Sequence, residues 1–322
     1  MNNFSEAQKS AAVERPAISA LCLAPMAGVT DVAFREVCVS FGAVQTCSEM
    51  VSARALVYQD KKSLTLLPRG KGETNYAVQL FGHEPELLAA AAEKVIALEK
   101  PDWLDLNMGC PTGKIIRNGD GAALMQNPRL VGEIVAAVRS AVGGSAKLSV
   151  KIRKGFDNGN INAVEIAQIA EANGAQRITV HGRTAKQLYS GLSDSSIIRE
   201  VKKAVSVPVV ANGDVFSPRD AEKLLQYTGA DYAMVGRGAM GNPWIFAGLE
   251  APGLYERVTV ALAQISRAAE LKGEYVACLE ARKHFAWYLR GLRGATRLRD
   301  KISRVTTLGE LRGIAVELCG NL

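Results

Sequence analysis

Polar and reactive side chains recur through residues 20–240, each directly after a short apolar run. Such runs, rich in Val, Ile and Leu, are typical of buried parallel strands. A stable core does not require a polar group at the end of nearly every strand, so this pattern predicts a functional site. The residues concerned are Pro25-Met26-Ala27-Gly28, Glu49, Gln79, Asn107 with Cys110, Lys151 with Arg153, His181 with Arg183, Asn212-Gly213-Asp214 and Gly236-Arg237.

Lys151 and His181 are candidates for chemistry on adjacent predicted strands. Burying the ammonium of a lysine is costly, so a purely structural Lys151 near a strand end is uncommon. It suits either a Schiff base, as in aldolases, or a positive charge held against an anionic cofactor ring. His181 is compatible with a satisfied core histidine. Arg183, two residues further on, points to the same face and favours a ligand site instead.

Cys110 stands in Asn107-Met-Gly-Cys-Pro111, at the turn that follows the fourth predicted strand. A lone cysteine is more often inert packing than chemistry. Here Pro111 and a loop rich in Gly and Lys over 112–121 predict a mobile, accessible position. A thiol with a pKa of about 8.5 is mostly protonated at neutral pH, so it serves as an acid as readily as a nucleophile.

Glycines near the last two predicted strand ends indicate a phosphate site. Gly236–Gly241 matches G-x-G-x-x-G, but no strand follows to complete a dinucleotide-binding βαβ unit. In barrels, backbone N–H groups after strands seven and eight bind phosphate together with a short helix. Gly213, Gly236 and Gly238 allow close backbone approach, and Arg237 adds a charged donor. A phosphate-bearing cofactor is therefore expected, and simple turn glycines are the alternative.

Eight apolar runs with helical patterns between them supply the frame for these residues. The runs cover 20–28, 44–50, 75–82, 103–110, 147–153, 177–183, 208–214 and 232–238. Helical patterns cover 31–41, 84–99, 127–142, 162–173, 194–205 and 217–227, with Thr30, Asn127 and Ser217 as expected N-caps. Strand followed by helix eight times predicts a (β/α)8 TIM barrel. A doubly wound sheet is the alternative α/β arrangement.

Strand signals end after Pro243, and the sequence from about residue 252 has helical patterning. We therefore predict a polar N-terminal extension over 1–17, a barrel over 18–247 and a small all-helical domain over 248–322. With 48% hydrophobic and 22% charged residues, disorder and fibrous structure are excluded.

Signal peptide, membrane span and metal site are all unexpected. Residues 1–16 have no apolar core of signal-peptide length, and no apolar run approaches the roughly 20 residues of a membrane span. The six cysteines form no C-x-x-C pair, and the three histidines lie far apart. A cytoplasmic protein without a metal is the expectation.

The positive charge of the chain is concentrated in residues 282–304. This stretch holds eight basic residues against one acid, Asp300, and so carries the whole net charge of +7. A solvated helix face usually interleaves both signs, which favours a polyanion such as RNA or DNA as partner. The basic residues are Arg282, Lys283, Arg290, Arg293, Arg297, Arg299, Lys301 and Arg304.

Taken together, these motifs resemble the tRNA-dihydrouridine synthase family, and among bacterial subgroups the B type most. The matching segments are APMAGVTDVAFR (24–35), SEM (48–50), VQLFG (78–82), DLNMGCP (105–111), VKIR (150–153), TVHGRT (179–184), ANGD (211–214) and VGRGAMGNPWIF (235–246). They cover residues 20–246. The segment KHFAWYLRGLRGA (283–295) resembles the helical tRNA-binding domain of the family less sharply.

The resemblance implies an FMN cofactor at the mouth of the barrel. Lys151 would stabilise negative charge on the reduced flavin, and Gln79 would hydrogen-bond the pyrimidine edge of the ring. Pro25, Met26 and Ala27 would line the isoalloxazine, whereas His181, Asn212, Gly213, Asp214, Gly236 and Arg237 would hold the ribityl chain and the phosphate.

The resemblance also implies the reaction. NADPH reduces FMN, hydride passes from flavin N5 to C6 of a D-loop uridine, and Cys110 donates a proton to C5. Lys151 and His181 complete the catalytic set, and Asn107, Arg153 and Arg183 are expected to bind the uracil. The basic helical segment would grip tRNA, the protein would be a monomer, and position 17 is weakly favoured as the target.

Two other functions remain open. An FMN-dependent oxidoreductase of free pyrimidines, similar to dihydroorotate or dihydropyrimidine dehydrogenase, needs the same barrel but gives no reason for the basic segment. A non-catalytic RNA-binding barrel explains that segment, but the presence of Cys110, Lys151 and His181 argues against it.

Overall fold

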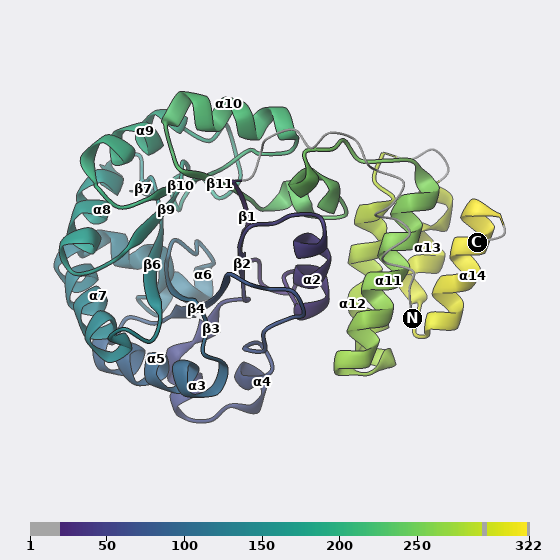
Figure 1. Ribbon diagram of the computed structural model, residues 1–322, viewed down its shortest axis with the longest axis horizontal. Helices are drawn as coiled ribbons and strands as arrows, with labels where there is room; N and C mark the ends of the chain where they lie inside the picture. The colour runs from purple at the N-terminus through teal and green to yellow at the C-terminus, as the bar shows by residue number, and fades with distance from the viewer. Residues whose placement is uncertain (1–19, 292–294, 321–322) are drawn as a thin grey trace.

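The computed structural model describes residues 20–291 and 295–320, in a barrel and a group of helices packed beside it (Figure 1). The predicted extension over 1–17 and Arg293 lie outside the described residues, and so do the side chains of residues 295–297 and 299.

Parallel strands form a closed ring in the order β1-β11-β10-β9-β6-β5-β4-β2. Hydrogen bonds from Leu23 N to Gln45 O and from Val44 N to Leu21 O, each 2.9 Å, join the first and last members. The (β/α)8 barrel is confirmed, and closure excludes a doubly wound open sheet. The strands are β1 (Leu21–Leu23), β2 (Thr46–Cys47), β3 (Val51–Ser52), β4 (Tyr76–Phe81), β5 (Trp103–Met108), β6 (Lys147–Arg153), β9 (Arg177–His181), β10 (Val209–Asn212) and β11 (Tyr232–Val235).

Helices surround this ring and connect its strands (Figure 1). They are α2 (Val32–Ser40), α3 (Ala53–Val57), α4 (Lys61–Leu64), α5 (Pro85–Glu99), α6 (Gly113–Arg117), α7 (Pro128–Val142), α8 (Ala163–Ala172), α9 (Ser195–Ala204) and α10 (Pro218–Thr228). A hairpin of β7 (Gly155–Asp157) and β8 (Asn160–Ile161) follows β6. Short 3₁₀ turns cover Gly121–Gln126, Arg237–Ala239 and Pro243–Ala247.

The expected N-caps are Asn127 and Ser217, whose side chains accept from Leu130 N and Asp220 N. Thr30 does not cap α2. Asp31 does so, accepting a 2.9 Å hydrogen bond from Phe34 N, because the Thr30 hydroxyl is used to close the preceding turn on Met26.

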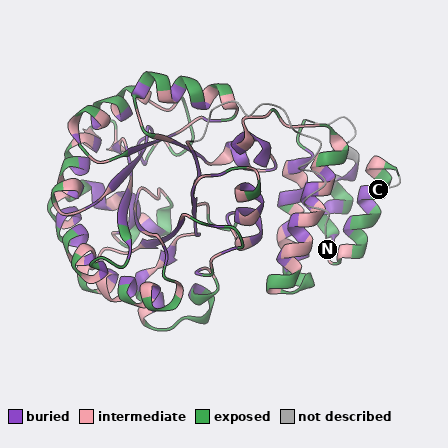
Figure 2. Ribbon diagram, viewed as in Figure 1, coloured by how far each residue is buried: buried purple, intermediate pink, exposed green. Residues whose placement is uncertain are grey.

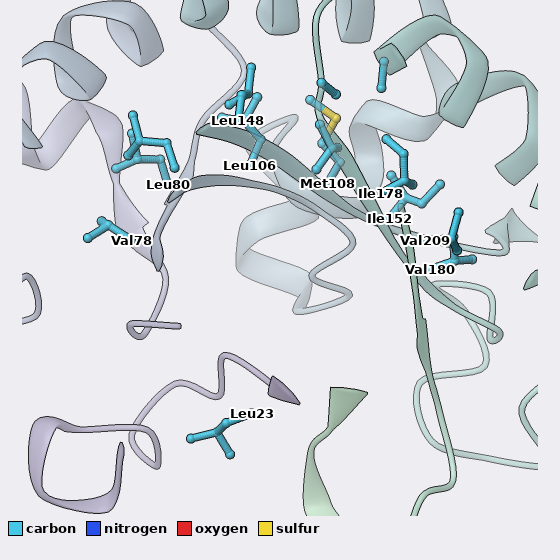
Figure 3. Packing of buried hydrophobic residues seen from close by; sticks show 14 of the residues in the cluster. Leu23, Val78, Leu80, Leu106, Met108, Leu148, Ile152, Ile178, Val180 and Val209 are labelled. Carbon is cyan, nitrogen blue, oxygen red and sulfur yellow. The ribbon is translucent and has the colours of Figure 1, made fainter. Parts of the chain in front are cut away.

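Alternate side chains along each strand divide between two environments. Leu148, Val150 and Ile152 of β6 belong to the large apolar cluster between strands and helices, part of which Figure 3 shows. Ser149, Lys151 and Arg153 alternate with them and face the inside of the barrel. Figure 2 shows that the strands are largely buried and that the exposed residues of the surrounding helices lie on the outer face. Because successive side chains of a strand point to opposite faces, every second residue of β6 places a polar side chain in the barrel interior.

Four helices follow the barrel: α11 (Leu254–Lys272), α12 (Glu274–Tyr288), α13 (Ala295–Arg304) and α14 (Leu308–Cys319). The all-helical C-terminal part expected from the sequence is confirmed. Arg267 of α11 pairs with Glu36 of α2 at 2.8 Å, and Phe34 of α2 meets His284 of α12 edge to face at 5.6 Å. The helices therefore pack on the barrel through α2. Among the described residues, no helix is both long and apolar enough to cross a membrane.

Candidate active site

A cavity of about 560 Å³ opens at the carboxyl ends of the barrel strands. It brings together nearly all of the residues that the sequence placed at a site. Those that line it are Pro25, Met26, Ala27, Gln79, Asn107, Cys110, Lys151, Arg153, His181, Asn212, Gly213, Asp214, Gly236 and Arg237. Arg183 does not line it.

Several cavity-lining residues were missed by the sequence reasoning. They are apolar or aromatic: Met50, Leu188, Tyr189, Val215, Phe216, Met234 and Met240 among others. Met50 and Met234 stood inside or beside segments that had been singled out. The loop residues Leu188 and Tyr189 carried no such signal, because their place at the cavity depends on how the connection after β9 folds.

A row of buried hydrogen bonds crosses the floor of the cavity. Gln79 Nε2 donates to Asp105 Oδ2 at 2.7 Å, and Asn107 Nδ2 donates to Gln79 Oε1 at 2.8 Å. Asp105 also accepts from Ser149 Oγ at 2.5 Å, yet burial dominates and raises the pKa of its carboxyl. The row fixes which end of the Gln79 amide faces Asn107.

Asn107 shapes the turn that carries Cys110. Its Oδ1 accepts hydrogen bonds from Gly109 N at 3.1 Å and from Cys110 N at 2.9 Å. The thiol is partly exposed to the cavity, and its Sγ lies 3.3 Å from Thr112 Oγ1. Residues 112–121, expected to be a mobile loop, contain the helix α6 and the start of a 3₁₀ turn. The Cys110 thiol is thus accessible from the cavity, while its backbone is fixed by the hydrogen bond to Asn107.

Lys151 reaches across the barrel interior from β6. Its Nζ donates to Asn212 Oδ1 at 3.1 Å, while Asn212 Nδ2 donates to Met234 O at 2.8 Å. Burial, reinforced by the nearby guanidinium of Arg153, lowers the pKa of Lys151 to about 8. A group with that pKa is still mostly protonated at neutral pH, so Lys151 presents a positive charge to the cavity.

His181 is nearly buried, and its ring has no hydrogen-bond partner within 20–291 and 295–320. Burial and then the positive charges of Lys151, Arg153, Arg183 and Arg237 lower its pKa to about 2. The imidazole is therefore neutral at physiological pH. The positive charges around His181 add to this shift but are a smaller cause than burial.

Arg153 and Arg183 are both held by main-chain oxygens. Arg153 donates from Nε to Gly109 O at 2.7 Å and from Nη1 to Thr184 O at 2.9 Å. Arg183 donates from Nη2 to Gly191 O at 2.6 Å and to Asp214 Oδ2 at 2.7 Å. Of the three residues expected to bind uracil, Asn107 and Arg153 line the cavity, whereas Arg183 lies behind its wall.

Asp214 joins two arginines at the edge of the cavity. Its Oδ1 lies 3.3 Å from Arg237 Nη2. Burial raises the pKa of the Asp214 carboxyl, but the hydrogen bonds from Arg183 and Ser193 outweigh burial, so the pKa is lowered overall. The Arg237 guanidinium also lies over the rings of Tyr189 and Phe216, at 4.4 and 5.3 Å from their centroids. Arg237 is thereby fixed with its positive charge beside the cavity.

Two of the three glycines at this edge, Gly213 and Gly238, have no room for a side chain, whereas a Cβ on Gly236 would meet its nearest atom only at 3.7 Å. A Cβ on Gly213 would lie 2.1 Å from Ser193 Oγ, and one on Gly238 would lie 2.1 Å from Val215 O. Two buried donors nearby, Ser193 Oγ and Arg183 Nη1, lack a partner in the part of the chain that the structure describes. Neither donor lines the cavity, but Gly213, Gly236 and Gly238 line it beside Arg237, and a glycine-rich edge of this kind is a feature of an anion-binding concavity.

The basic residues of the C-terminal segment have diverse environments. Arg282 donates from Nε and Nη2 to Val305 O at 3.0 and 2.9 Å, and so holds the helices together. Lys301 pairs with Glu317 at 2.5 Å and Arg304 with Asp300 at 3.0 Å. Lys283 and Arg290 are exposed. A Cβ on Gly28 would lie 3.1 Å from Lys283 Nζ, so this ammonium is beside the cavity wall.

A closed parallel barrel with a thiol, an ammonium and a glycine-rich anion cradle at its carboxyl ends defines a (β/α)8-barrel enzyme of the cofactor-binding kind. Among the described residues, no cluster of three or more His, Cys, Asp or Glu side chains is placed to ligate a metal.

Comparison with known proteins identifies the family. A family model described as dihydrouridine synthase (Dus) matches residues 22–319. The tRNA-dihydrouridine synthase B of Shewanella oneidensis is 42% identical over 279 residues, 84% of this chain and 86% of that protein. The protein of the same name from Pasteurella multocida is 39% identical over 294 residues, 88% of each chain. The chain therefore belongs to the dihydrouridine synthase family, and the resemblance to the B type and the assignment as an oxidoreductase are confirmed.

Among solved structures, histamine dehydrogenase from Rhizobium sp. 4-9 is similar in fold. The TM-score is 0.53 at 12% sequence identity, over 82% of this chain and 48% of the dehydrogenase chain. This likeness concerns the barrel architecture alone.

Proposed function

We propose that the protein is an FMN-dependent tRNA-dihydrouridine synthase that reduces the C5–C6 double bond of a D-loop uridine with electrons from NADPH. The observation that carries the proposal is one cavity that unites the Cys110 thiol, the Lys151 ammonium and the glycine cradle. Membership of the dihydrouridine synthase family and relatives named for tRNA support it.

The residues present fit the phosphate of FMN. Gly213, Gly236 and Gly238 line the cavity as the cradle, while Arg183 and Ser193 do not line it and support it from behind through Asp214. Arg237 adds a fixed guanidinium, and the amides of Gly236 and neighbouring residues stand at the start of a 3₁₀ turn. The positive charges of Lys151, Arg183 and Arg237, which after burial contribute to the lowered pKa of His181, suit a dianionic group.

The remaining wall would hold the ring and the ribityl chain. Pro25, Met26 and Ala27 would line the isoalloxazine, and Asn212, Asp214 and neutral His181 would hold the chain. Gln79 would meet the pyrimidine edge, its amide oriented by Asp105 and Asn107. A pKa of about 8 keeps Lys151 mostly protonated at neutral pH, which suits a cation for an anionic ring rather than a Schiff-base amine.

Bound FMN would supply the hydride for C6 of the uracil. The protein's own part is to bind the base and to deliver a proton. Cys110 would hold that proton at Sγ and give it to C5, because its turn places the thiol in the cavity. Arg153 would polarise a uracil carbonyl from the cavity wall. Arg183 would act from behind, by fixing Asp214 and the loop at Ser190 and Gly191.

tRNA is the proposed substrate and partner of a monomeric, cytoplasmic enzyme. The barrel over 18–247 would carry the chemistry, and the helices of 248–322 would grip phosphates. Lys283 and Arg290 are the best placed for this, since both are exposed and Lys283 lies beside the cavity wall. A target uridine must leave its stacked position, at a cost of a few kcal/mol that phosphate contacts would offset.

The test is a visible absorption spectrum of the purified protein, followed by turnover. An oxidised-flavin spectrum that bleaches with NADPH and recovers faster with unmodified tRNA would support the proposal, and dihydrouridine in digested tRNA would identify the product. Equal recovery with free uracil or orotate would favour an oxidoreductase of small pyrimidines. A protein that binds tRNA and stays colourless after incubation with FMN would be an RNA-binding barrel.

A further inference from the structure

A second, larger cavity lies behind the segment that carries Cys110. It has a volume of about 700 Å³, and its lining includes His83, Lys114, Asn118 and Asp120. Cys110 and Thr112 line the first cavity. The segment 110–120 is therefore a partition with open space on both sides, so packing alone supports it only partly.

One side-chain hydrogen bond spans the second cavity and reaches this partition. His83 Nδ1 lies 2.7 Å from Asp120 Oδ1, and the two residues are 37 positions apart in the chain. His83 follows β4, and its side chain is 41% exposed, whereas the Asp120 side chain is only 10% exposed. His83 is the only side chain within 20–291 and 295–320 that pairs with the Asp120 carboxylate.

The two residues that follow Asp120, Gly121 and Ala122, pack directly against Cys110. The residue after Asp120 is Gly121, where an added Cβ would lie 2.8 Å from Cys110 O and 3.1 Å from Cys110 Cβ. Ala122 N donates to Cys110 O at 3.1 Å. The backbone next to Asp120 thus packs against Cys110, opposite the hydrogen bond that Asn107 accepts from Cys110 N.

We propose that His83 and Asp120 are positioning residues for Cys110, and that the hydrogen bond between them holds the partition at the distance from β4 that proton delivery requires. This rests on the proposed role of Cys110 as proton donor. Loss of His83 would leave a nearly buried carboxylate without a protein partner, and the segment would move toward water in the second cavity. A displacement of about 1 Å at a reacting group costs on the order of a hundredfold in rate.

The experiment compares three variants. His83→Ala removes the partner of Asp120, whereas His83→Asn keeps a donor close to the position of Nδ1. Lys202→Met is the matched control, because it breaks a half-buried ion pair, Lys202 to Asp231 at 2.7 Å. Asp231 directly precedes β11 and accepts a hydrogen bond from Val209 N of β10, so this pair lies at the amino ends of the strands, away from the cavity. The readouts are hydrogen–deuterium exchange over 110–126, and kcat and KM with tRNA.

We expect His83→Ala to raise exchange over 110–126, most at Ala122, and to lower kcat about 10- to 100-fold with KM for tRNA unchanged. His83→Asn should restore both, and Lys202→Met should alter neither. Unchanged exchange in His83→Ala, or raised exchange with unaltered kcat, would overturn the inference. An inactive wild-type protein would refute the proposed function alone, because the exchange measurement needs no turnover.

Discussion

Gly213 offers a sharp test of the anion cradle, because two separate costs oppose any side chain there. Its φ of +134° lies in the region that side-chain-bearing residues rarely adopt. An added Cβ would also lie 2.1 Å from Ser193 Oγ and 2.6 Å from Ser193 Cβ. Gly213→Ala therefore strains the backbone and overpacks the cradle at once.

The magnitude follows from these two terms. The strained φ costs about 1–3 kcal/mol, and overpacking a close contact costs about 1–3 kcal/mol. Gly213→Ala should lower the free energy of unfolding by about 2–6 kcal/mol, the sum of these terms. Gly229→Ala is the control for strain alone, since Gly229 has a φ of +68° and no atom within 4 Å of an added Cβ.

A second substitution separates the terms. Ser193→Gly removes both atoms that an alanine at 213 would meet, and the buried Ser193 Oγ has no partner among the described residues to lose. The double variant should recover the overpacking term of about 1–3 kcal/mol, less about 0.5–1 kcal/mol for the added glycine. The strain term should remain.

The assay is urea-induced unfolding of the four variants, with FMN affinity measured on the same proteins. Gly213→Ala should weaken FMN binding, and Gly229→Ala should not. If Gly213→Ala is no more destabilising than Gly229→Ala, the cradle is not closely packed and our account of it fails. Failure of Ser193→Gly to rescue any stability would show that Ser193 is not the obstacle.

Three further substitutions test the site and the frame. Cys110→Ala should leave unfolding and flavin content unchanged and slow dihydrouridine formation by at least about a hundredfold, and full turnover would remove the thiol from the reaction. Folding lowers the pKa of Lys151 from 10.5 to about 8, so the unfolded chain holds this proton more tightly. The wild-type free energy of unfolding should thus rise by up to about 3 kcal/mol between pH 8 and 10.5, a rise that Lys151→Met should lack in denaturant titrations across that range. Arg35→Met should cost about 3–5 kcal/mol in the same titrations, because it leaves the buried carboxylate of Glu73, 2.8 Å from Arg35 Nε, without its countercharge; a loss below about 1 kcal/mol would contradict this.

The barrel was predictable because its strands follow a local rule. For β6, a short run rich in Val, Ile and Leu predicted the bounds 147–153, which the structure reproduces. The first strand was predicted too long, as 20–28, whereas β1 ends at Leu23. Residues 24–28 leave the sheet because Thr30 closes a turn on Met26, and the hydropathy of the sequence gives no sign of that hydrogen bond.

The sequence predicted which residues gather at the site, but not which of them line the cavity and which lie behind its wall. A common position at strand ends is enough to gather Gln79, Lys151 and Asn212 at one cavity. That Arg183 stands behind Asp214 depends on the path of the loop through Gly191, which no spacing reveals.

Side-chain contacts between segments that are distant in the chain could not be predicted from the sequence. The partner of Lys301 is Glu317, beyond the stretch in which charges were counted, so the basic segment is less one-sided than its composition indicates. His83 and Asp120 likewise drew no attention, since neither belongs to a pattern and only the fold brings them together.

Helix α2 belongs to two cores at the same time. Phe34 packs in the apolar cluster of the barrel, while Val37 packs in that of the C-terminal helices. Asp31 and Glu36 add ion pairs to Lys272 and Arg267. The C-terminal helices are therefore not an exchangeable module. A chimaeric protein in which only the residues after 247 came from a relative would pack unrelated side chains against Val37. Substitutions in the C-terminal helices must therefore be matched by substitutions in α2.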